Sequence, residues 1–251
     1  MILCFATYKR NEIWKDVASP WEDALRKFPQ NLRIHHWLGG AYADKGMCRE
    51  AIAELGLALK EDPYYLGSHH NLAICYSQMG LLESAIKEYN LIIQLKPDYL
   101  EAYSPLAMIY INMRKIDEAY ILLQNARTIS ASNPIINALL GHVYCEKNDY
   151  KNAFYYFSES ISANPDIVYG HYAFGICLLK YGKNSESREH LIKAIEIDPE
   201  YIECYFFLAI SYEQEKNHEK AIFYYREVLS HSKEESVLVK QTRMRLSELT
   251  K

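Results

Sequence analysis

The chain has 251 residues, of which 49% are hydrophobic and 24% charged, as in an ordinary folded protein. Its formal net charge of −4 argues against a nucleic-acid partner, because nucleic acids are bound by a concentrated basic surface. No stretch reaches the roughly 20 apolar residues of a membrane-spanning helix, so we expect no membrane insertion by this segment itself.

The first 31 residues differ in pattern from the rest of the chain. Residues 2–6 are apolar but too few to span a membrane. Residues 14–29 have the pattern of one amphipathic helix that ends at Pro29. We expect a single helix in this part, after a segment that does not share the pattern of the later residues.

Residues 32–235 repeat with a period of 34. A small residue followed three places later by tyrosine recurs at Gly39/Tyr42, Ala73/Tyr76, Ala107/Tyr110, Gly141/Tyr144 and Ala209/Tyr212. A second small residue lies twelve places after the first, at Ala51, Ala85, Ala119, Ala153, Ser187 and Ala221. Proline recurs with the same period at Pro29, Pro63, Pro97, Pro165 and Pro199. Six units without insertion or deletion indicate tandem copies of one structural element.

Each unit has the pattern of two short amphipathic helices. In the second unit, Ala73 and Ala85 let the two backbones approach closely, and Gly80 lies where the first helix must end. Pro97 then stops the second helix, because proline lacks an N–H group and restricts the residue before it. Pro105 falls within the first helix of the third unit, and we expect that helix to start late, near Glu101.

The pattern resembles that of the tetratricopeptide-repeat family. The first unit reads Leu38-Gly39…Tyr42…Ala51…Leu55…Ala58…Pro63, in the order of that family's signature. The resemblance implies an all-α fold, a right-handed superhelical solenoid of tandem helix-turn-helix repeats with about fourteen helices and no β-sheet. Residues 1–31 would form an N-terminal segment with a partial repeat, residues 32–235 six repeats, and residues 236–251 a C-terminal capping helix.

The N-terminal segment carries a second resemblance. Residues 7–14 read T-x-x-RN-x-x-W, and Trp21, Asp23, Asn31 and Arg33 lie at spacings similar to a junction in bacterial membrane proteins related to lumenal O-mannosyltransferases. That junction comes after a last transmembrane helix, so the chain would be the soluble C-terminal arm of a membrane-embedded glycosyltransferase-like protein. The alternative is that Trp14 and Trp21 pack an N-terminal capping helix. Apolar 20-residue spans encoded upstream would decide between the two.

In the tetratricopeptide family, the first helices form a concave inner face that binds peptides or proteins. The corresponding candidate residues are Tyr169, Tyr172, Ile176, Phe206, Ile210, His142, Met108, Asn112, His36 and His70. Those of units three to six are mostly apolar, and an apolar groove is typical of a partner site. We expect a protein or peptide ligand anchored on Tyr169, Tyr172, Ile176 and Phe206. Alternatively, some of these residues contact neighbouring first helices instead.

No catalytic or cofactor motif accompanies the repeats. The sequence has no glycine-rich phosphate loop, no H-E-x-x-H, no G-x-S-x-G and no metal-spaced cysteine cluster. His36 and His70 recur one period apart, but a zinc site needs about three protein ligands. We therefore expect a scaffold with no enzymatic activity, no cofactor and no metal.

The six cysteines are irregularly spaced and none forms a C-x-x-C pair. They are Cys4, Cys48, Cys75, Cys145, Cys177 and Cys204. We expect free buried thiols that act as small hydrophobic residues. This expectation favours a reducing compartment such as the cytoplasm, whereas the second resemblance would place the chain outside it.

Overall fold

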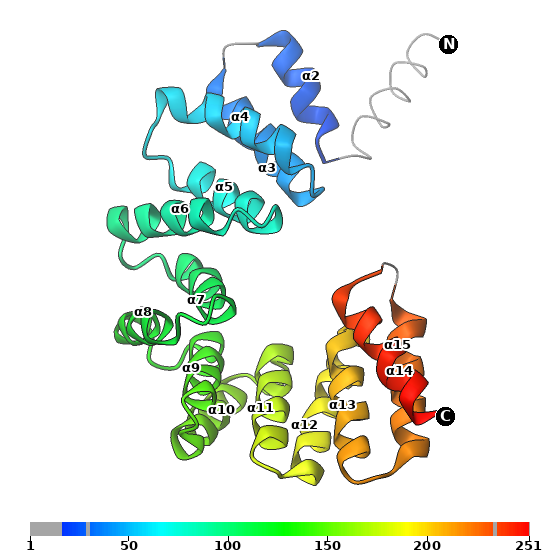
Figure 1. The fold of residues 1–251 in the computed structure, drawn as a ribbon. Coiled ribbons are helices and arrows are strands. Elements are labelled where there is room, and N and C mark those ends of the chain that lie inside the picture. Colours follow the sequence, from blue (N-terminus) through cyan, green and yellow to red (C-terminus); the bar gives the residue numbers. More distant parts are fainter. Residues whose placement is uncertain (1–16, 29–30, 233–234, 251) are drawn as a thin grey trace, which may run out of the picture. The chain divides into compact units, whose positions relative to one another are not determined.

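The computed structural model describes residues 17–28, 31–232 and 235–250. Every regular element in these ranges is a helix, with fourteen α-helices, one 3-10 helix and no strand. In chain order they are α2 (Ser19–Lys27), α3 (Leu32–Asp44), α4 (Cys48–Glu61), α5 (Leu66–Gln78), α6 (Leu82–Leu95), η1 (Leu100–Ala102), α7 (Tyr103–Asn112), α8 (Ile116–Ile129), α9 (Pro134–Glu146), α10 (Tyr150–Ala163), α11 (Val168–Lys180), α12 (Asn184–Ile197), α13 (Ile202–Gln214), α14 (His218–His231) and α15 (Val237–Leu249) (Figure 1). The expectation of an all-α fold with about fourteen helices is confirmed.

The chain forms two compact units, Met1–Met113 and Arg114–Lys251. In the first unit, α3 packs on α4 and α5 on α6, and α3 also contacts α5. In the second unit, α9, α11 and α13 pair with α10, α12 and α14, and α11 contacts both α9 and α13 (Figure 1). The first helices of successive repeats therefore make an inner layer within each unit, and the second helices make an outer layer.

Each turn between paired helices contains one residue with positive φ, at the same place in every repeat. These residues are Gly46, Gly80, Arg114, Asn148, Gly182 and Lys216. Gly80 has φ of 73°, as expected for the residue that reverses the chain. Lys216 has φ of 60°, a conformation that costs a residue with a Cβ atom about 1–2 kcal/mol.

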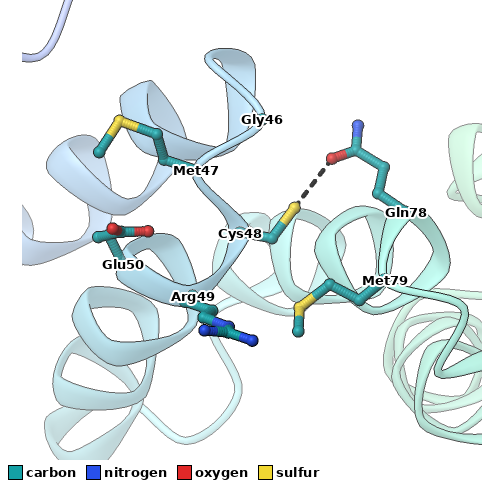
Figure 2. A pocket seen from close by; sticks show the side chains of 7 residues that line it. All are labelled: Gly46, Met47, Cys48, Arg49, Glu50, Gln78 and Met79. Carbon is teal, nitrogen blue, oxygen red and sulfur yellow. Dashed lines mark hydrogen bonds between the residues drawn. The ribbon is translucent and has the colours of Figure 1, made fainter. Parts of the chain in front are cut away.

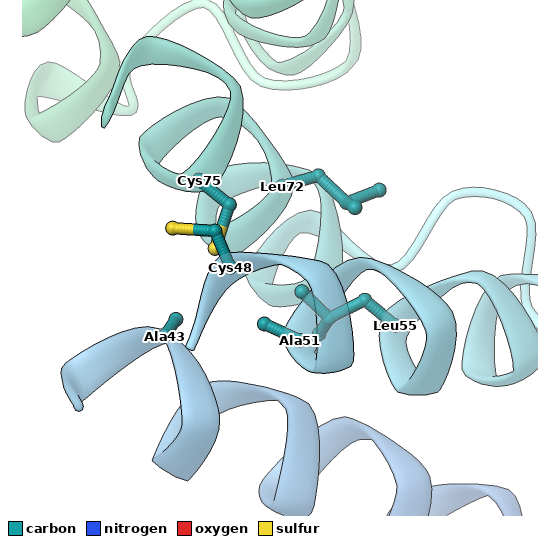
Figure 3. Close-up of a cluster of buried hydrophobic side chains, with 6 residues drawn as sticks. All are labelled: Ala43, Cys48, Ala51, Leu55, Leu72 and Cys75. Atoms are coloured by element: carbon teal, nitrogen blue, oxygen red, sulfur yellow. The ribbon is translucent and has the colours of Figure 1, made fainter. Parts of the chain in front are cut away.

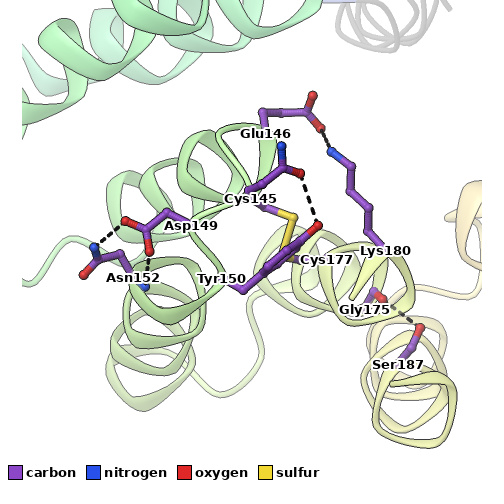
Figure 4. Close-up of a disulfide and its surroundings, with 10 residues drawn as sticks. Cys145, Glu146, Asp149, Tyr150, Asn152, Gly175, Cys177, Lys180 and Ser187 are labelled. Atoms are coloured by element: carbon purple, nitrogen blue, oxygen red, sulfur yellow. Dashed lines mark hydrogen bonds and ion pairs between the residues drawn. A yellow bond between two sulfur atoms is a disulfide. The ribbon is translucent and has the colours of Figure 1, made fainter. Parts of the chain in front are cut away.

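The small residues lie where paired helices approach most closely. A Cβ atom at Gly39 would come within 2.6 Å of the Leu55 side chain, and one at Gly141 within 2.7 Å of Phe157. Where serine replaces alanine, the Ser187 hydroxyl donates a 2.7 Å hydrogen bond to the Gly175 carbonyl across the same contact (Figure 4). The contact thus explains the small residues in the repeat pattern.

The fourth residue of repeats two to six ties the start of its first helix to the preceding loop. His69 Nε2 donates to the Pro63 carbonyl at 2.9 Å, and the Tyr103 hydroxyl donates to the Pro97 carbonyl at 2.6 Å. The same six-residue span is closed by Asn137 with Ala131, His171 with Pro165 and Tyr205 with Pro199. The carbonyl that would otherwise lack a partner at the end of the preceding repeat is satisfied in this way.

The third repeat begins as expected from its proline. The 3-10 helix precedes α7, which starts at Tyr103 and so holds Pro105 within its first turn. Proline is tolerated there because the first N–H groups of a helix have no intrahelical acceptor. The expectation of a late helix start is confirmed.

The helices at the two ends cover the outermost repeats. In α2, Trp21 stacks on Trp37 with ring centroids 5.7 Å apart. In α15, Leu238, Leu246 and Leu249 pack against the buried cluster around Tyr225. Residues 1–16, including Trp14 and the motif at residues 7–14, lie outside the described residues. The proposed domain boundaries stay predictions.

The expectation that every cysteine is free is wrong for one pair. Cys145 of α9 and Cys177 of α11 form a disulfide between consecutive first helices, with Cα atoms 5.9 Å apart (Figure 4). Cys48, Cys75 and Cys204 are free and buried, as expected. Because a disulfide is present, the cysteines no longer favour a reducing compartment.

Candidate functional site

The main candidate surface lies on the inner layer of the second unit. Tyr169, Tyr172 and Ile176 are on α11, where their spacing puts them along one stripe of the helix, and all three are partly exposed. His142 of α9 contacts this stripe, because its Nδ1 shares a 2.7 Å hydrogen bond with the Tyr169 hydroxyl. The structure therefore brings together four of the ten candidate residues.

Two aromatic residues outside the candidate set complete this surface. Tyr172 makes edge contacts with Tyr201 and Phe207, with ring centroids 4.9 Å and 6.0 Å apart, and lies 6.3 Å from Tyr169. We refer to Tyr169, Tyr172, Tyr201 and Phe207 as the aromatic patch. All four are partly exposed, and they come from α11, from α13 and from the turn before α13.

Burial sets the protonation states at the aromatic patch. It raises the pKa of Tyr169, Tyr172 and Tyr201, so all three phenols are protonated at neutral pH and can donate hydrogen bonds. Burial also lowers the pKa of His142, which is therefore neutral at that pH. The patch consequently presents apolar and uncharged polar groups to a ligand.

Charged residues border the patch at the end of α9. Glu146 forms an ion pair with Lys180 of α11 at 3.0 Å and a second one with Arg114. Burial raises the pKa of Glu146, but the hydrogen bond and charge of Lys180 outweigh that effect and leave the pKa below its ordinary value. This ionised cluster joins the ends of two inner helices beside the disulfide (Figure 4).

Phe206 and Ile210 do not extend the patch as expected. Phe206 occupies the position equivalent to Tyr172, yet it is 6% exposed because it packs against Phe207 and against Tyr225 of α14. Ile210 is partly buried beside the same cluster. Phe206 thus offers little surface to a ligand, whereas its neighbour Phe207 takes the exposed place.

The remaining candidates lie in the first unit. His36 is buried, shares a 3.0 Å hydrogen bond with Ser68 Oγ and packs edge-on against Tyr65. His70 packs edge-on against Tyr89 and Tyr99. Met108 is partly buried and Asn112 exposed at the C-terminal end of α7. Within the described ranges, no group of three metal-ligating side chains could hold an ion.

A cavity of about 540 Å³ in the first unit was not expected from the sequence. Its lining includes Trp37, 51% exposed, and Tyr65, 41% exposed, together with Arg33, His36, Ala58, Glu61 and Asp62. Trp37 was missed because it occupies the sixth place of its repeat, and none of the ten candidate residues was taken from that place. The large apolar ring of this residue was the signal that the sequence offered.

A second cavity, of about 440 Å³, opens at the turn between α3 and α4. It is lined by Gly46, Met47, Cys48, Arg49, Glu50, Gln78 and Met79 (Figure 2). The Cys48 thiol donates a hydrogen bond to Gln78 Oε1 at 2.9 Å within it. A cysteine thus faces a surface opening in the first unit.

Comparisons with known proteins agree with this architecture. The tetratricopeptide-repeat profile matches residues 66–99, 136–167 and 202–233. A solved tetratricopeptide repeat protein from Parabacteroides merdae is 17% identical, with 98% of this chain and 96% of that chain covered and a TM-score of 0.80. None of the curated proteins compared with the chain matches it.

Two longer chains of solved structures contain similar folds. One chain in the crystal structure of the APC/C hetero-tetramer Cut9–Hcn1 is 18% identical to this chain, with a TM-score of 0.77. The match covers 96% of this chain and 46% of that chain. Yeast Tom70 is 16% identical, with 93% of this chain and 58% of that chain covered and a TM-score of 0.66. At these identities the likeness concerns the fold alone.

These findings define the type of protein. Repeats of this kind are typical of protein-binding scaffolds without enzymatic activity. In the part of the chain that the structure describes, no helix has the length and apolar character to cross a membrane. The resemblance of the N-terminal segment to a glycosyltransferase-like junction stays a prediction. The chain is therefore a helical solenoid repeat protein that contains tetratricopeptide repeats.

Proposed function

We propose that the chain is a scaffold that binds a peptide segment of a partner protein against the aromatic patch. The observation that carries the proposal is the partial exposure of four neighbouring aromatic rings from α11, from α13 and from the turn before α13. Such rings supply a large contact area with few rotatable bonds, which is why tyrosine dominates the energetics of many interfaces. The bordering Glu146–Lys180 pair offers polar groups at the rim.

The chemistry of the patch restricts its ligand. The protonated phenols of Tyr172 and Tyr201 carry no charge and can donate to peptide carbonyls, while the rings can contact apolar side chains. The patch itself contains no charged side chain, so a strongly charged peptide gains little there. We expect a ligand with one or two apolar or aromatic anchor residues flanked by polar ones.

The test begins with selection of peptides from a random library on the immobilised full-length chain. The dissociation constant of the selected peptide is then measured by calorimetry for four chains: the unchanged one, Tyr172→Ala, Tyr155→Ala and Trp37→Ala. Tyr155 is a matched control, because it is 51% exposed but lies on the outer helix α10. We expect Tyr172→Ala to weaken binding by about 2 kcal/mol, roughly thirty-fold in Kd, and Tyr155→Ala to leave it unchanged.

Two outcomes contradict the proposal. Loss of binding in Trp37→Ala but not in Tyr172→Ala would place the ligand in the first unit's cavity. Failure to select any peptide would favour a structural spacer without a ligand. Circular dichroism of each variant controls for loss of helical structure.

The alternative function, a soluble arm of a membrane-embedded glycosyltransferase-like protein, rests on the N-terminal segment alone. In that case the same patch would present acceptor proteins. Apolar spans encoded upstream of Met1 would support this alternative without contradicting peptide binding.

A further inference from the structure

Cys48 and Cys75 lie side by side between consecutive repeats of the first unit. Cys48 is the first residue of α4 and Cys75 is in α5, and these two helices pack together. Both thiols are free and buried within one apolar cluster, where their sulfur atoms are neighbours (Figure 3). The two side chains are also joined by a hydrogen bond.

Access from solvent differs between the two thiols. Cys48 lines the 440 Å³ cavity beside Arg49 and Gln78, whereas Cys75 is completely buried (Figure 2). A reagent from solution can therefore reach only Cys48.

The protonation state of Cys75 suits a thiol that reacts after Cys48 and not before it. Burial, together with the hydrogen bond to Cys48, raises the pKa of Cys75 to about 12. Its thiol therefore stays protonated at neutral pH while Cys48 is reduced. Conversion of Cys48 to a disulfide removes that hydrogen-bond partner and supplies an electrophilic sulfur next to it.

The second unit shows that the fold accepts such a bond. Cys145 and Cys177 already form a disulfide between helices of consecutive repeats. A bond between Cys48 and Cys75 would likewise connect consecutive repeats, through a second helix and the next first helix.

We propose that Cys48 and Cys75 form a thiol–disulfide exchange site that takes a small organic disulfide as oxidant. The Cys48 thiolate attacks one sulfur of the small disulfide, whose S–S bond breaks and releases one small thiolate, which takes up a proton. Cys75 then loses its proton to solvent and attacks the Cys48 sulfur, releasing the second small thiol. In total, two cysteine thiols are oxidised to one disulfide, and one small disulfide is reduced to two thiols.

The product would connect α4 covalently to α5. These helices belong to different repeats, so the bond would restrain the repeat interface in the first unit without involving the aromatic patch. The site is thus independent of the proposed peptide binding.

Oxidised glutathione is the probe for the test. Every chain carries Cys4→Ser, so that this thiol cannot react, and the set comprises that background alone and with Cys75→Ser, Cys48→Ser or Cys204→Ser. Cys204 is the matched control, because it is a free, fully buried thiol elsewhere in the chain. After incubation, thiols are blocked, and trypsin peptides are analysed by mass spectrometry without reduction.

In the background chain we expect a peptide containing Cys48 linked to one containing Cys75, with no glutathione left on either. Cys75→Ser should stop at a glutathione adduct on Cys48, and Cys48→Ser should give no adduct on Cys75. Cys204→Ser should behave like the background.

The proposal is wrong if the background chain gives no Cys48–Cys75 link, or if its glutathione adduct on Cys48 is never resolved. An adduct on Cys75 in Cys48→Ser would also overturn the assigned order of attack. The background chain decides the main point even if a serine variant fails to fold.

Discussion

A methyl group added at Gly141 tests whether close helix contact is the reason for the small residues. In Gly141→Ala, the new Cβ atom would lie 2.7 Å from the Phe157 ring, closer than such atoms approach one another. Phe157 is completely buried and stacked on Phe174, with centroids 5.0 Å apart, so its ring has little room to move. Gly56→Ala is the matched control, since Gly56 is also inside a helix but no atom lies within 4 Å of its added Cβ.

The expected magnitudes come from two opposing effects. Replacing glycine by alanine inside a helix stabilises it by about 1 kcal/mol. Overpacking a buried contact costs about 1–3 kcal/mol. Gly56→Ala should therefore raise the free energy of unfolding by about 1 kcal/mol, whereas Gly141→Ala should leave it unchanged or lower it by up to about 2 kcal/mol.

Urea unfolding followed by circular dichroism measures both variants. Because repeat arrays can unfold in parts, amide hydrogen exchange in α9 and α10 should locate the loss in Gly141→Ala. A double-mutant cycle with Phe157→Leu should show coupling of at least about 1 kcal/mol, because the smaller side chain relieves the clash. Equal shifts for Gly56→Ala and Gly141→Ala in the same direction would refute the close-contact explanation.

Three further predictions concern stability. Lys216→Gly should raise the free energy of unfolding, measured in urea, by about 0.5–1 kcal/mol. Glycine adopts positive φ without the conformational cost that lysine bears, and its larger loss of backbone entropy on folding offsets part of this gain. An unchanged midpoint would contradict this. Burial and then the neighbouring His171 lower the pKa of His190 to about 4, so the unfolded state binds more protons, and stability should fall as pH drops from about 6.5 to about 4. His190→Leu should flatten that part of the pH profile, and a profile of unchanged slope would count against the assignment. Tyr103→Phe removes the hydrogen bond to the Pro97 carbonyl and should lower the unfolding free energy by about 1 kcal/mol, whereas no loss would mean that water satisfies this carbonyl equally well.

The repeat pattern predicted the helix pairs because the same close contact between paired helices recurs in successive repeats. Gly141 against Phe157 and Gly39 against Leu55 are the same contact in different repeats, so its requirement for a small residue shows in the sequence. The turn residue is also visible where it is glycine. Lys216 adopts the same positive φ, but its residue type does not indicate this in the sequence, because the surrounding repeat can impose a positive φ on residues other than glycine.

The surface was less predictable than the fold. Periodicity identifies the face of a helix but not how far the neighbouring side chains cover it, so Phe206 is buried by Tyr225 while Phe207 is partly exposed. Cys145 and Cys177 were not recognised as a pair because they occupy different places in their repeats, 32 residues apart. Trp37 was missed because no candidate residue was taken from its place in the repeat, although Phe207, at the same place in the sixth repeat, is also partly exposed.

The hydrogen bond from the fourth residue of repeats two to six bears on how such a chain can diverge. An imidazole at His69, a phenol at Tyr103 and an amide at Asn137 each hold the equivalent carbonyl six residues earlier. This place requires a hydrogen-bond donor of suitable length and not one residue type. Exchange among these three side chains therefore costs little stability, whereas an aliphatic residue would leave the carbonyl without a donor. Copies of one ancestral unit can therefore lose sequence similarity at this place and retain the same loop.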